Sequence, residues 1–144
     1  MDKYKMLPDP IQHFSGHLYR IQAIRSFGNV LEGELGGYIA SESNLSQDDD
    51  SWVAENAKVF GHAQVFGSAL VCGNAMVYGN AMVYGKPRVY GNARVFGRAV
   101  VYDHAEVYGS ALVLDYARVS GVARVHGNAH VLDNIEVGGN EEQF

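Results

Sequence analysis

The chain of 144 residues is poor in cysteine and proline, with one cysteine, Cys72, and three prolines. A single cysteine excludes a disulfide within the chain and fits a reducing compartment, so we expect a cytoplasmic protein. So few prolines exclude a long proline-rich linker. No apolar run approaches the roughly 20 residues of a membrane span, and no segment resembles a signal peptide, so we expect no membrane association.

Basic residues are also scarce. Residues 1–50 carry four basic and eight acidic side chains, residues 51–144 carry seven and eight, and the net charge is −5. Neither part offers the basic surface that nucleic acids require, so we expect no direct nucleic-acid binding. Hydrophobic residues make up 47% of the chain, which is enough for the core of one domain.

Valine recurs at every sixth position from Val53 to Val137, fifteen times without a slip. A small residue stands two positions before each valine, and from residue 57 onward it is alanine except at Pro87 and Ile135. Two positions after each valine stands glycine or aspartate, with Glu55 as the one exception. The repeating unit is therefore A-x-V-(F/Y)-G-N.

A period of six fits no helix, but it fits a short strand followed by a turn. Alternation along the strand directs alanine and valine to one face and their neighbours to the other. Glycine and asparagine tolerate the positive φ that a sharp corner needs. A strand this short cannot bury its own apolar face, whereas stacked copies can, so the pattern predicts a solenoid.

The repeats of residues 53–140 resemble those of the hexapeptide-repeat proteins that fold as left-handed parallel β-helices. The resemblance implies an all-β, triangular solenoid in which three hexads form one coil of about 18 residues, with about five regular coils. Side chains then sort into three faces that repeat every coil. The first face begins at Val53, the second face at Val59 and the third face at Val65.

The repeat begins irregularly. Ile39 and Leu45 lie six apart, but Val53 follows Leu45 by eight, so two extra residues fall near Asp48–Asp50. We predict irregular first hexads over residues 37–48 and a solvated loop at Asp48–Asp50. Residues 1–35 are predicted to form an N-terminal cap, in which LYRIQAI alternates like a strand. The solenoid is predicted to span 36–140, followed by a tail at 141–144.

The outward positions of the second face are strongly apolar along its length, and those of the third face are apolar in the early coils. Contiguous exposed apolar area of this kind usually marks an interface. We therefore expect a homo-oligomer, most simply a dimer, although stacking of aromatics along a sheet would also explain part of the pattern. The expected interface residues are Phe60, Met76, Tyr78, Phe96, Leu112, Leu114 and Leu132 on the second face, and Phe66, Tyr84 and Tyr102 on the third.

Four histidines in the repeats are the candidates for catalysis. His62 and His104 fall at corners, and His126 and His130 point outward on adjacent faces, with no carboxylate evidently placed to orient any of them. The acyltransferases of the family that the repeats resemble use a histidine as the general base, with acyl-CoA lying along the coils and often beside a projecting loop. In this chain no insertion interrupts residues 53–140. Acyl transfer is thus the alternative function.

Other functions of this fold fit less well. The γ-type carbonic anhydrases bind zinc with a histidine pair spaced by five, whereas His126 and His130 are spaced by four and lack a third ligand. Ice-binding solenoids favour ranks of threonine, which the repeats lack. We expect neither a metal nor a cofactor.

Residues 18–47 resemble the start of prophage-encoded hexapeptide-repeat proteins that are commonly labelled transferases. This resemblance implies a phage or mobile-element product acting in the host cytoplasm. We therefore expect a non-catalytic interaction protein that binds and inhibits a host factor, such as a CRISPR or other defence component. Glu42, Asp48, Asp49 and Asp50 would suit a basic surface on that partner.

Overall fold

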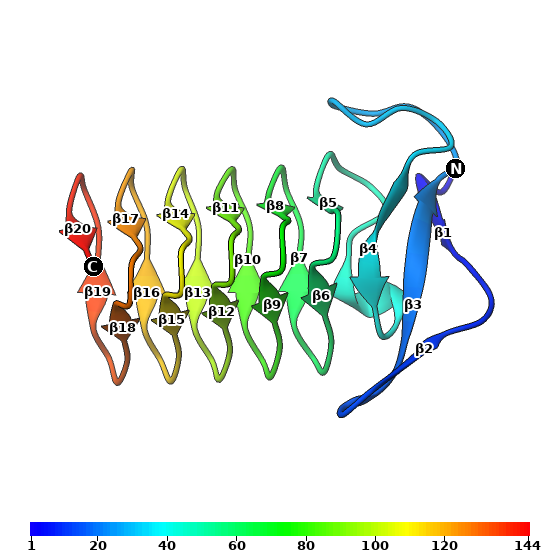
Figure 1. Cartoon of the computed structure of the whole chain (residues 1–144). Helices are drawn as coiled ribbons and strands as arrows, with labels where there is room; N and C mark the ends of the chain where they lie inside the picture. Colours follow the sequence, from blue (N-terminus) through cyan, green and yellow to red (C-terminus); the bar gives the residue numbers. More distant parts are fainter.

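In the computed structural model, which describes all 144 residues, the chain winds into a three-sided solenoid with an antiparallel cap at its N-terminal end (Figure 1). Each regular coil contributes one two-residue strand to each of three sheets of parallel strands. Val59 pairs with Val77 and Val95 pairs with Val113, so successive partners along a sheet are separated by three hexads. The predicted all-β solenoid, with three hexads in each coil, is confirmed.

The three sheets correspond to the three predicted faces. The first face contains β5 (Trp52–Val53), β8 (Leu70–Val71), β11 (Arg88–Val89), β14 (Glu106–Val107), β17 (Arg124–Val125) and β20 (Glu142–Gln143). The second face contains β4 (Leu35–Ile39), β6 (Lys58–Val59), β9 (Met76–Val77), β12 (Arg94–Val95), β15 (Leu112–Val113) and β18 (His130–Val131). The third face contains β7 (Gln64–Val65), β10 (Met82–Val83), β13 (Val100–Val101), β16 (Arg118–Val119) and β19 (Glu136–Val137).

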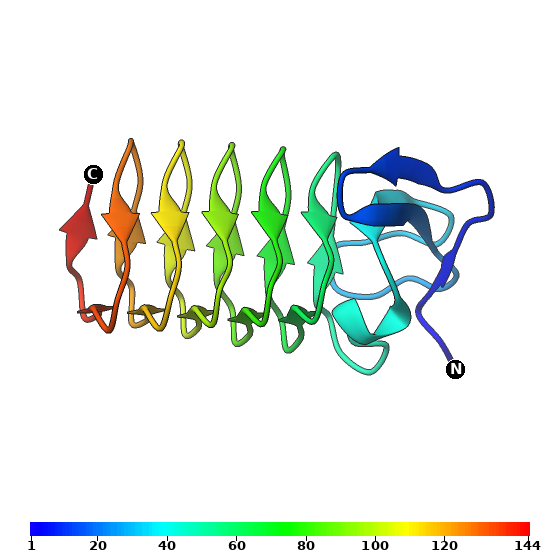
Figure 2. The ribbon, with the colours of Figure 1, turned by 90° about the horizontal axis from the view of Figure 1, so that it is seen from below.

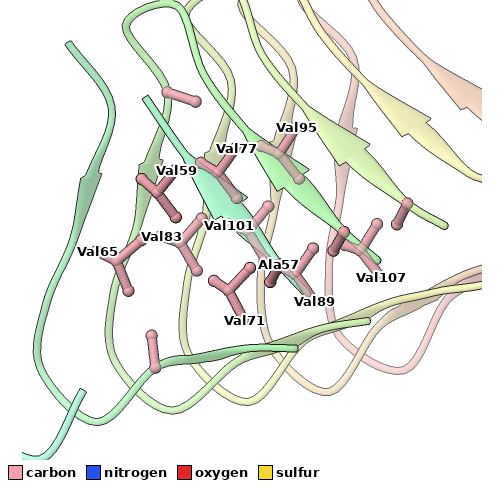
Figure 3. Packing of buried hydrophobic residues seen from close by; sticks show 14 of the residues in the cluster. Ala57, Val59, Val65, Val71, Val77, Val83, Val89, Val95, Val101 and Val107 are labelled. Atoms are coloured by element: carbon pink, nitrogen blue, oxygen red, sulfur yellow. The ribbon is translucent and has the colours of Figure 1, made fainter. Parts of the chain in front are cut away.

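Valine and alanine fill the interior, as the alternation predicts. In Figure 3, three columns of valine side chains from the three faces converge on the solenoid axis. The repeat valines from Val53 to Val137 are at most 2% exposed, and the alanines two positions before them are also buried. Burial of each valine side chain contributes roughly 1.5–3 kcal/mol of transfer free energy, so the stack is held mainly by these columns.

The last hexad departs from this apolar pattern. Glu141 and Gln143 occupy the positions of the inward alanine and valine, and both are exposed. The hexad nevertheless continues the first face, because β20 pairs in parallel with β17 through Arg124–Glu142 and Val125–Gln143. Residues 141–144, for which a tail is predicted, therefore extend a sheet of the solenoid by one strand.

The corner after each strand uses a residue with positive φ. Most are glycines, but Glu55, Asp103, Asp115 and Asp133 adopt the same conformation with φ of 57–58°. Three of these carboxylates accept a hydrogen bond from a backbone N–H in the next coil, at distances of 2.9–3.0 Å. The acidic side chain thus offsets the strain of a left-handed conformation by linking adjacent coils.

Glycine at such a corner is also needed for close approach of the coils. A Cβ atom at Gly121 would lie 2.6 Å from the backbone nitrogen of Gly139, whereas a Cβ at Gly139 would meet nothing within 4 Å. Both residues have positive φ, 64° and 58°. We expect Gly139→Ala to lower the free energy of unfolding by about 1 kcal/mol through backbone strain alone. Gly121→Ala should lower it by about 2–4 kcal/mol, because the coils must also separate.

Urea titrations followed by circular dichroism would compare the two variants. Equal losses in Gly121→Ala and Gly139→Ala would show that coil spacing does not constrain this corner.

The cap consists of β1 (Tyr4–Met6), β2 (Ile11–His13) and β3 (Gly16–Ala23), which pair antiparallel. β3 contains all but the last residue of the predicted strand LYRIQAI, and it pairs antiparallel with β4, which in turn pairs parallel with β6. The cap therefore joins an antiparallel sheet to the parallel second face. Figure 2 shows the cap at the blue, N-terminal end of the solenoid. No helix is long and apolar enough to span a membrane.

The irregular start of the solenoid agrees with the predicted insertion. Ile39 pairs with Val59 and Leu45 with Val65, whereas Val53 pairs with Val71. The partners in the first two pairs are therefore two residues farther apart in the sequence than the partners in the third pair. The third pair has the regular separation of three hexads. The short 3-10 helix η1 (Glu42–Asn44) lies in this irregular coil. The two extra residues thus fall between Leu45 and Val53.

Lys3 anchors the cap to this irregular coil. Its side chain is fully buried, and the ammonium donates to the backbone oxygens of Asp49 and Ser51 and to the Ser51 hydroxyl. Burial lowers the pKa of Lys3, and the Asp49 carboxylate 3.4 Å away opposes that shift. Next to it, the hydroxyl of Tyr4 donates to the backbone oxygen of Leu45 at 2.7 Å. Residues 3–4 thereby close the N-terminal end of the core.

Candidate interaction surfaces

Stacked rings form a ladder on the outside of each face, in the column that follows the inward valines. Consecutive rings in these ladders lie 4.9–5.5 Å apart with interplanar angles of 1–28°. The ladders are Phe60–Tyr78–Phe96 on the second face, Phe66–Tyr84–Tyr102 on the third and Tyr90–Tyr108–His126–Phe144 on the first. Because each ring covers the face of its neighbour, the ladders present ring edges to the surroundings.

The second face continues beyond its ladder with aliphatic side chains. Leu114 and Leu132 extend the aromatic column, while Met76 and Leu112 stand in the column before the valines. All four are half-buried, as are Tyr78 and Phe96. These six residues form an apolar surface over β9, β12, β15 and β18, which we call the second-face patch. Arg94 and His130 interrupt it in the column before the valines.

Phe60 is the exception among the residues predicted for this interface. It is 4% exposed, because His13 and Phe14 from the β2–β3 hairpin pack against its ring at centroid distances of 4.9 and 6.0 Å. The cap therefore covers the first coil of the second face, and Phe60 belongs to the folded interior of the chain. Phe14 itself is 81% exposed at the edge of the second-face patch.

The predicted residues of the third face form a separate surface. Phe66, Tyr84 and Tyr102 stack on one another, but Ser120 and Gly138 follow them, so the apolar column ends after three coils. A corner that carries exposed polar residues such as His62 and Asn80 separates this ladder from the second face. The structure thus divides the ten predicted interface residues between two faces, of which the second has the longer apolar surface.

The predicted acidic surface is partly taken up by the fold. Asp49 turns inward: its carboxylate accepts hydrogen bonds from the hydroxyl of Ser51 at 2.6 Å and from the backbone of Gly67 at 2.7 Å. Burial raises the pKa of Asp49, but these hydrogen bonds and the charge of Lys3 outweigh burial and lower it overall. The solvated loop predicted for residues 48–50 is therefore wrong at Asp49. Glu42, Asp48 and Asp50 are exposed.

Among the four candidate histidines, His126 alone has a carboxylate partner. Its Nε2 lies 2.9 Å from Oε2 of Glu142, and its ring is stacked between Tyr108 and Phe144. Sequence reasoning missed this pair, although the register contains it, because Glu142 lies one coil after Arg124 and so beside His126. His62, His104 and His130 are exposed and make no side-chain hydrogen bond.

The surface has several hollows. One of about 340 Å³ lies between the cap and the first face, where Gly28 and Trp52 meet Asp50, Lys86 and Arg88. No three or more histidine, cysteine, aspartate or glutamate side chains gather as metal ligands would. Cys72 lies on the first face, where burial raises the pKa of its thiol.

Three parallel sheets, a valine and alanine interior and apolar outer ladders define a capped, three-sided β-solenoid protein. Two stretches in its central coils, residues 69–85 and 88–103, match the YdcK beta solenoid repeat family. These two stretches therefore resemble beta-solenoid repeats of the YdcK type. No curated protein matches the chain. The resemblance of residues 18–47 to prophage-encoded transferases thus has no support from a named relative.

Proposed function

We propose that the protein is a non-catalytic interaction module that self-associates through the second-face patch. The observation that carries this proposal is the run of half-buried apolar side chains across four consecutive strands, from Met76 and Tyr78 to Leu132. A flat, rigid surface of this kind loses little conformational entropy on docking, because its backbone is fixed by hydrogen bonds to both neighbouring coils.

Stacking along the sheet explains only part of the second-face patch. The rings of Tyr78 and Phe96 are 4.9 Å apart and stabilise one another. Met76, Leu112 and Leu132 gain nothing comparable from stacking. The other outward positions in the column of Met76 and Leu112 are charged or polar, as at Arg94 and His130. Aliphatic side chains at outward positions favour a surface that a partner covers.

Phe96→Asp tests the second-face patch directly. A charge in the centre of the patch should weaken self-association by about two orders of magnitude or more, because the carboxylate loses water without gaining a partner. The matched control is Tyr108→Asp, which makes the same change in the aromatic column of the first face. Light scattering across a concentration series would report the mass, and circular dichroism would verify the fold.

The proposal predicts an oligomer for the wild type and for Tyr108→Asp, and a monomer for Phe96→Asp. A wild-type chain that remains a single monodisperse monomer at high concentration would refute self-association.

The second part of the proposal is that a phage or mobile element encodes the protein and that the protein inhibits a host factor. The resemblance of residues 18–47 supports this part. The exposed carboxylates of Glu42, Asp48 and Asp50 suit a basic surface on such a partner. Tagged protein should capture this partner from a bacterial lysate, and a Glu42→Lys, Asp48→Lys, Asp50→Lys variant should not. Equal capture by both proteins would remove the acidic loop from the interface.

A second candidate function, acyl transfer from acyl-CoA, is favoured by the contact between His126 and Glu142. A carboxylate 2.9 Å from Nε2 can orient the imidazole of a general base. If this function holds, acyl-CoA should raise the melting temperature of the wild type but not of His126→Ala. Absence of any shift with acetyl-CoA and longer acyl-CoAs would count against acyl transfer.

A further inference from the structure

We propose a specific geometry for self-association, in which two copies pack second face against second face with their solenoids antiparallel. The two-fold axis crosses the face between β12 and β15. This inference rests on the proposed self-association and specifies which residues meet.

The cap determines which strands are available. Phe60, which follows β6, is buried beneath His13 and Phe14, so a partner can reach only β9, β12, β15 and β18. At the usual strand spacing of about 4.8 Å, these four strands form a strip about 19 Å long. The midpoint of the strip lies between β12 and β15. A two-fold axis at this point lets each copy use the whole strip.

Two-fold symmetry allows two simple ways to pack the second face of one copy on the second face of the other. When a face packs on its own copy, the two-fold axis lies in the plane of the interface, either along the solenoid or across it. An axis along the solenoid places both caps at the same end, where the projecting Phe14 side chains, each 81% exposed, would hold the faces apart. An axis across the solenoid places the caps at opposite ends. Each Phe14 then lies beyond β18 of the partner, at the end of its apolar strip.

The antiparallel arrangement also matches unlike apolar groups. With β9 opposite β18 and β12 opposite β15, Tyr78 faces Leu132 of the second copy and Phe96 faces Leu114. Two-fold symmetry makes each contact twice, so the aromatic half of each strip packs on the leucine half of the other. In this arrangement the ring edges of one copy pack against branched aliphatic side chains of the other. These groups fill a flat interface better than two sets of rings would, because each ring is already stacked within its own chain.

Charge at the corner supports the same arrangement. Arg98 forms no ion pair in its own chain, and its guanidinium lies 5.7 Å from the ring of Tyr116. In the antiparallel dimer, Arg98 of one copy faces the corner of the other copy that contains Asp115 and Tyr116. In the parallel arrangement it would face Asn92, which offers no charge. Only the antiparallel arrangement therefore gives this arginine a carboxylate.

Crosslinking between two single-cysteine variants distinguishes the arrangements. Packed sheets lie about 10 Å apart, which is too far for a disulfide, so a short bismaleimide is the appropriate reagent. Three exposed corner asparagines outside the second-face patch provide matched positions: Asn80, Asn134 and Asn74. In a Cys72→Ala background, Asn80→Cys mixed with Asn134→Cys reports the antiparallel dimer. Asn80→Cys mixed with Asn74→Cys reports the parallel dimer.

A mass tag on the Asn80→Cys copy would identify mixed products. We expect a crosslinked heterodimer from the first mixture and little or none from the second. Crosslinking mainly in the second mixture would overturn the antiparallel geometry and leave self-association intact. A dimer by light scattering that crosslinks in neither mixture would place the interface elsewhere and overturn the geometry. A monomer by light scattering would refute both proposals.

Phe14 offers an independent test, since this side chain should touch the partner although it lies outside the second-face patch. Phe14→Asp should weaken the dimer by about tenfold or more without unfolding the chain. Leu31→Asp is the control, because Leu31 is also highly exposed, at 70%, on the cap. Equal dimerisation by the two variants would exclude Phe14 from the interface and overturn the proposed placement of the caps.

Discussion

Val95→Asp is expected to abolish the folded solenoid or to lower its free energy of unfolding by at least about 4 kcal/mol. Val95 is fully buried and pairs with Val77 and Val113 in the middle of the second face. The substitution removes roughly 1.5–3 kcal/mol of apolar transfer free energy. It also places a carboxylate among valines and alanines, where no donor can compensate for lost hydration, at a further cost of several kcal/mol. Total stabilities of about 5–15 kcal/mol leave little margin for such a loss.

Arg118→Asp is the matched control, because Arg118 precedes the buried Val119 on β16, is exposed and lies on the third face, outside the second-face patch. This variant should change the free energy of unfolding by less than about 1 kcal/mol, since the new carboxylate remains hydrated. Urea unfolding followed by far-ultraviolet circular dichroism would measure both. Comparable losses in the two variants would contradict the assignment of inward and outward positions.

Lys3→Ala is expected to detach the cap and to lower the free energy of unfolding by about 3–5 kcal/mol. The buried ammonium contacts the Asp49 carboxylate and the backbone oxygens of Asp49 and Ser51. Without it these acceptors remain enclosed, and the Asp49 carboxylate loses its counter-ion. Limited proteolysis should then cleave the variant near residues 40–52 at protease concentrations that leave the wild type intact.

Lys5→Ala serves as the control for Lys3→Ala. Lys5 is exposed and only two residues away, on strand β1, so its removal alters charge without opening the core. The control should retain the proteolytic resistance and the stability of the wild type to within about 0.5 kcal/mol. If both variants were equally stable, Lys3 would not hold the cap.

The sequence predicted the repeating part of the fold because each hexad has the same alternation of inward and outward residues and the same kind of corner. Alternation identified Val95 as inward and Arg94 as outward, and the period of six identified the corners. Even the two extra residues between Leu45 and Val53 were visible as a break in spacing. Such features depend on contacts between adjacent coils, which the register determines.

The sequence could not predict contacts made by segments outside the register. Phe60 shares the column of Tyr78 and should be equally exposed, but the β2–β3 hairpin folds back over it. Nothing in the spacing of the hexads specifies where the tip of that hairpin lies. Asp49 likewise belongs to the inserted loop, and its inward orientation depends on Lys3, which is far away in the sequence.

The pair of His126 and Glu142 illustrates an intermediate case. The two residues are distant in the sequence, and only the register of the coils places Glu142 next to Arg124 and hence beside His126. A search for carboxylates close in sequence overlooks such a pair. In a solenoid, candidate partners of a catalytic histidine should therefore be sought one full coil before and after it.

The polar last hexad gives the two ends of the solenoid unequal resistance to opening. At the N-terminal end, Lys3 and Tyr4 tie the cap to residues 45–51, so opening there must break buried polar contacts. At the other end, Glu141 and Gln143 bury no apolar surface, and Ile135 is already 48% exposed. Because each coil is stabilised mainly by its neighbours, opening should begin at β20 and spread toward the cap. Amide protection against hydrogen exchange should accordingly rise coil by coil from residue 144 toward the centre.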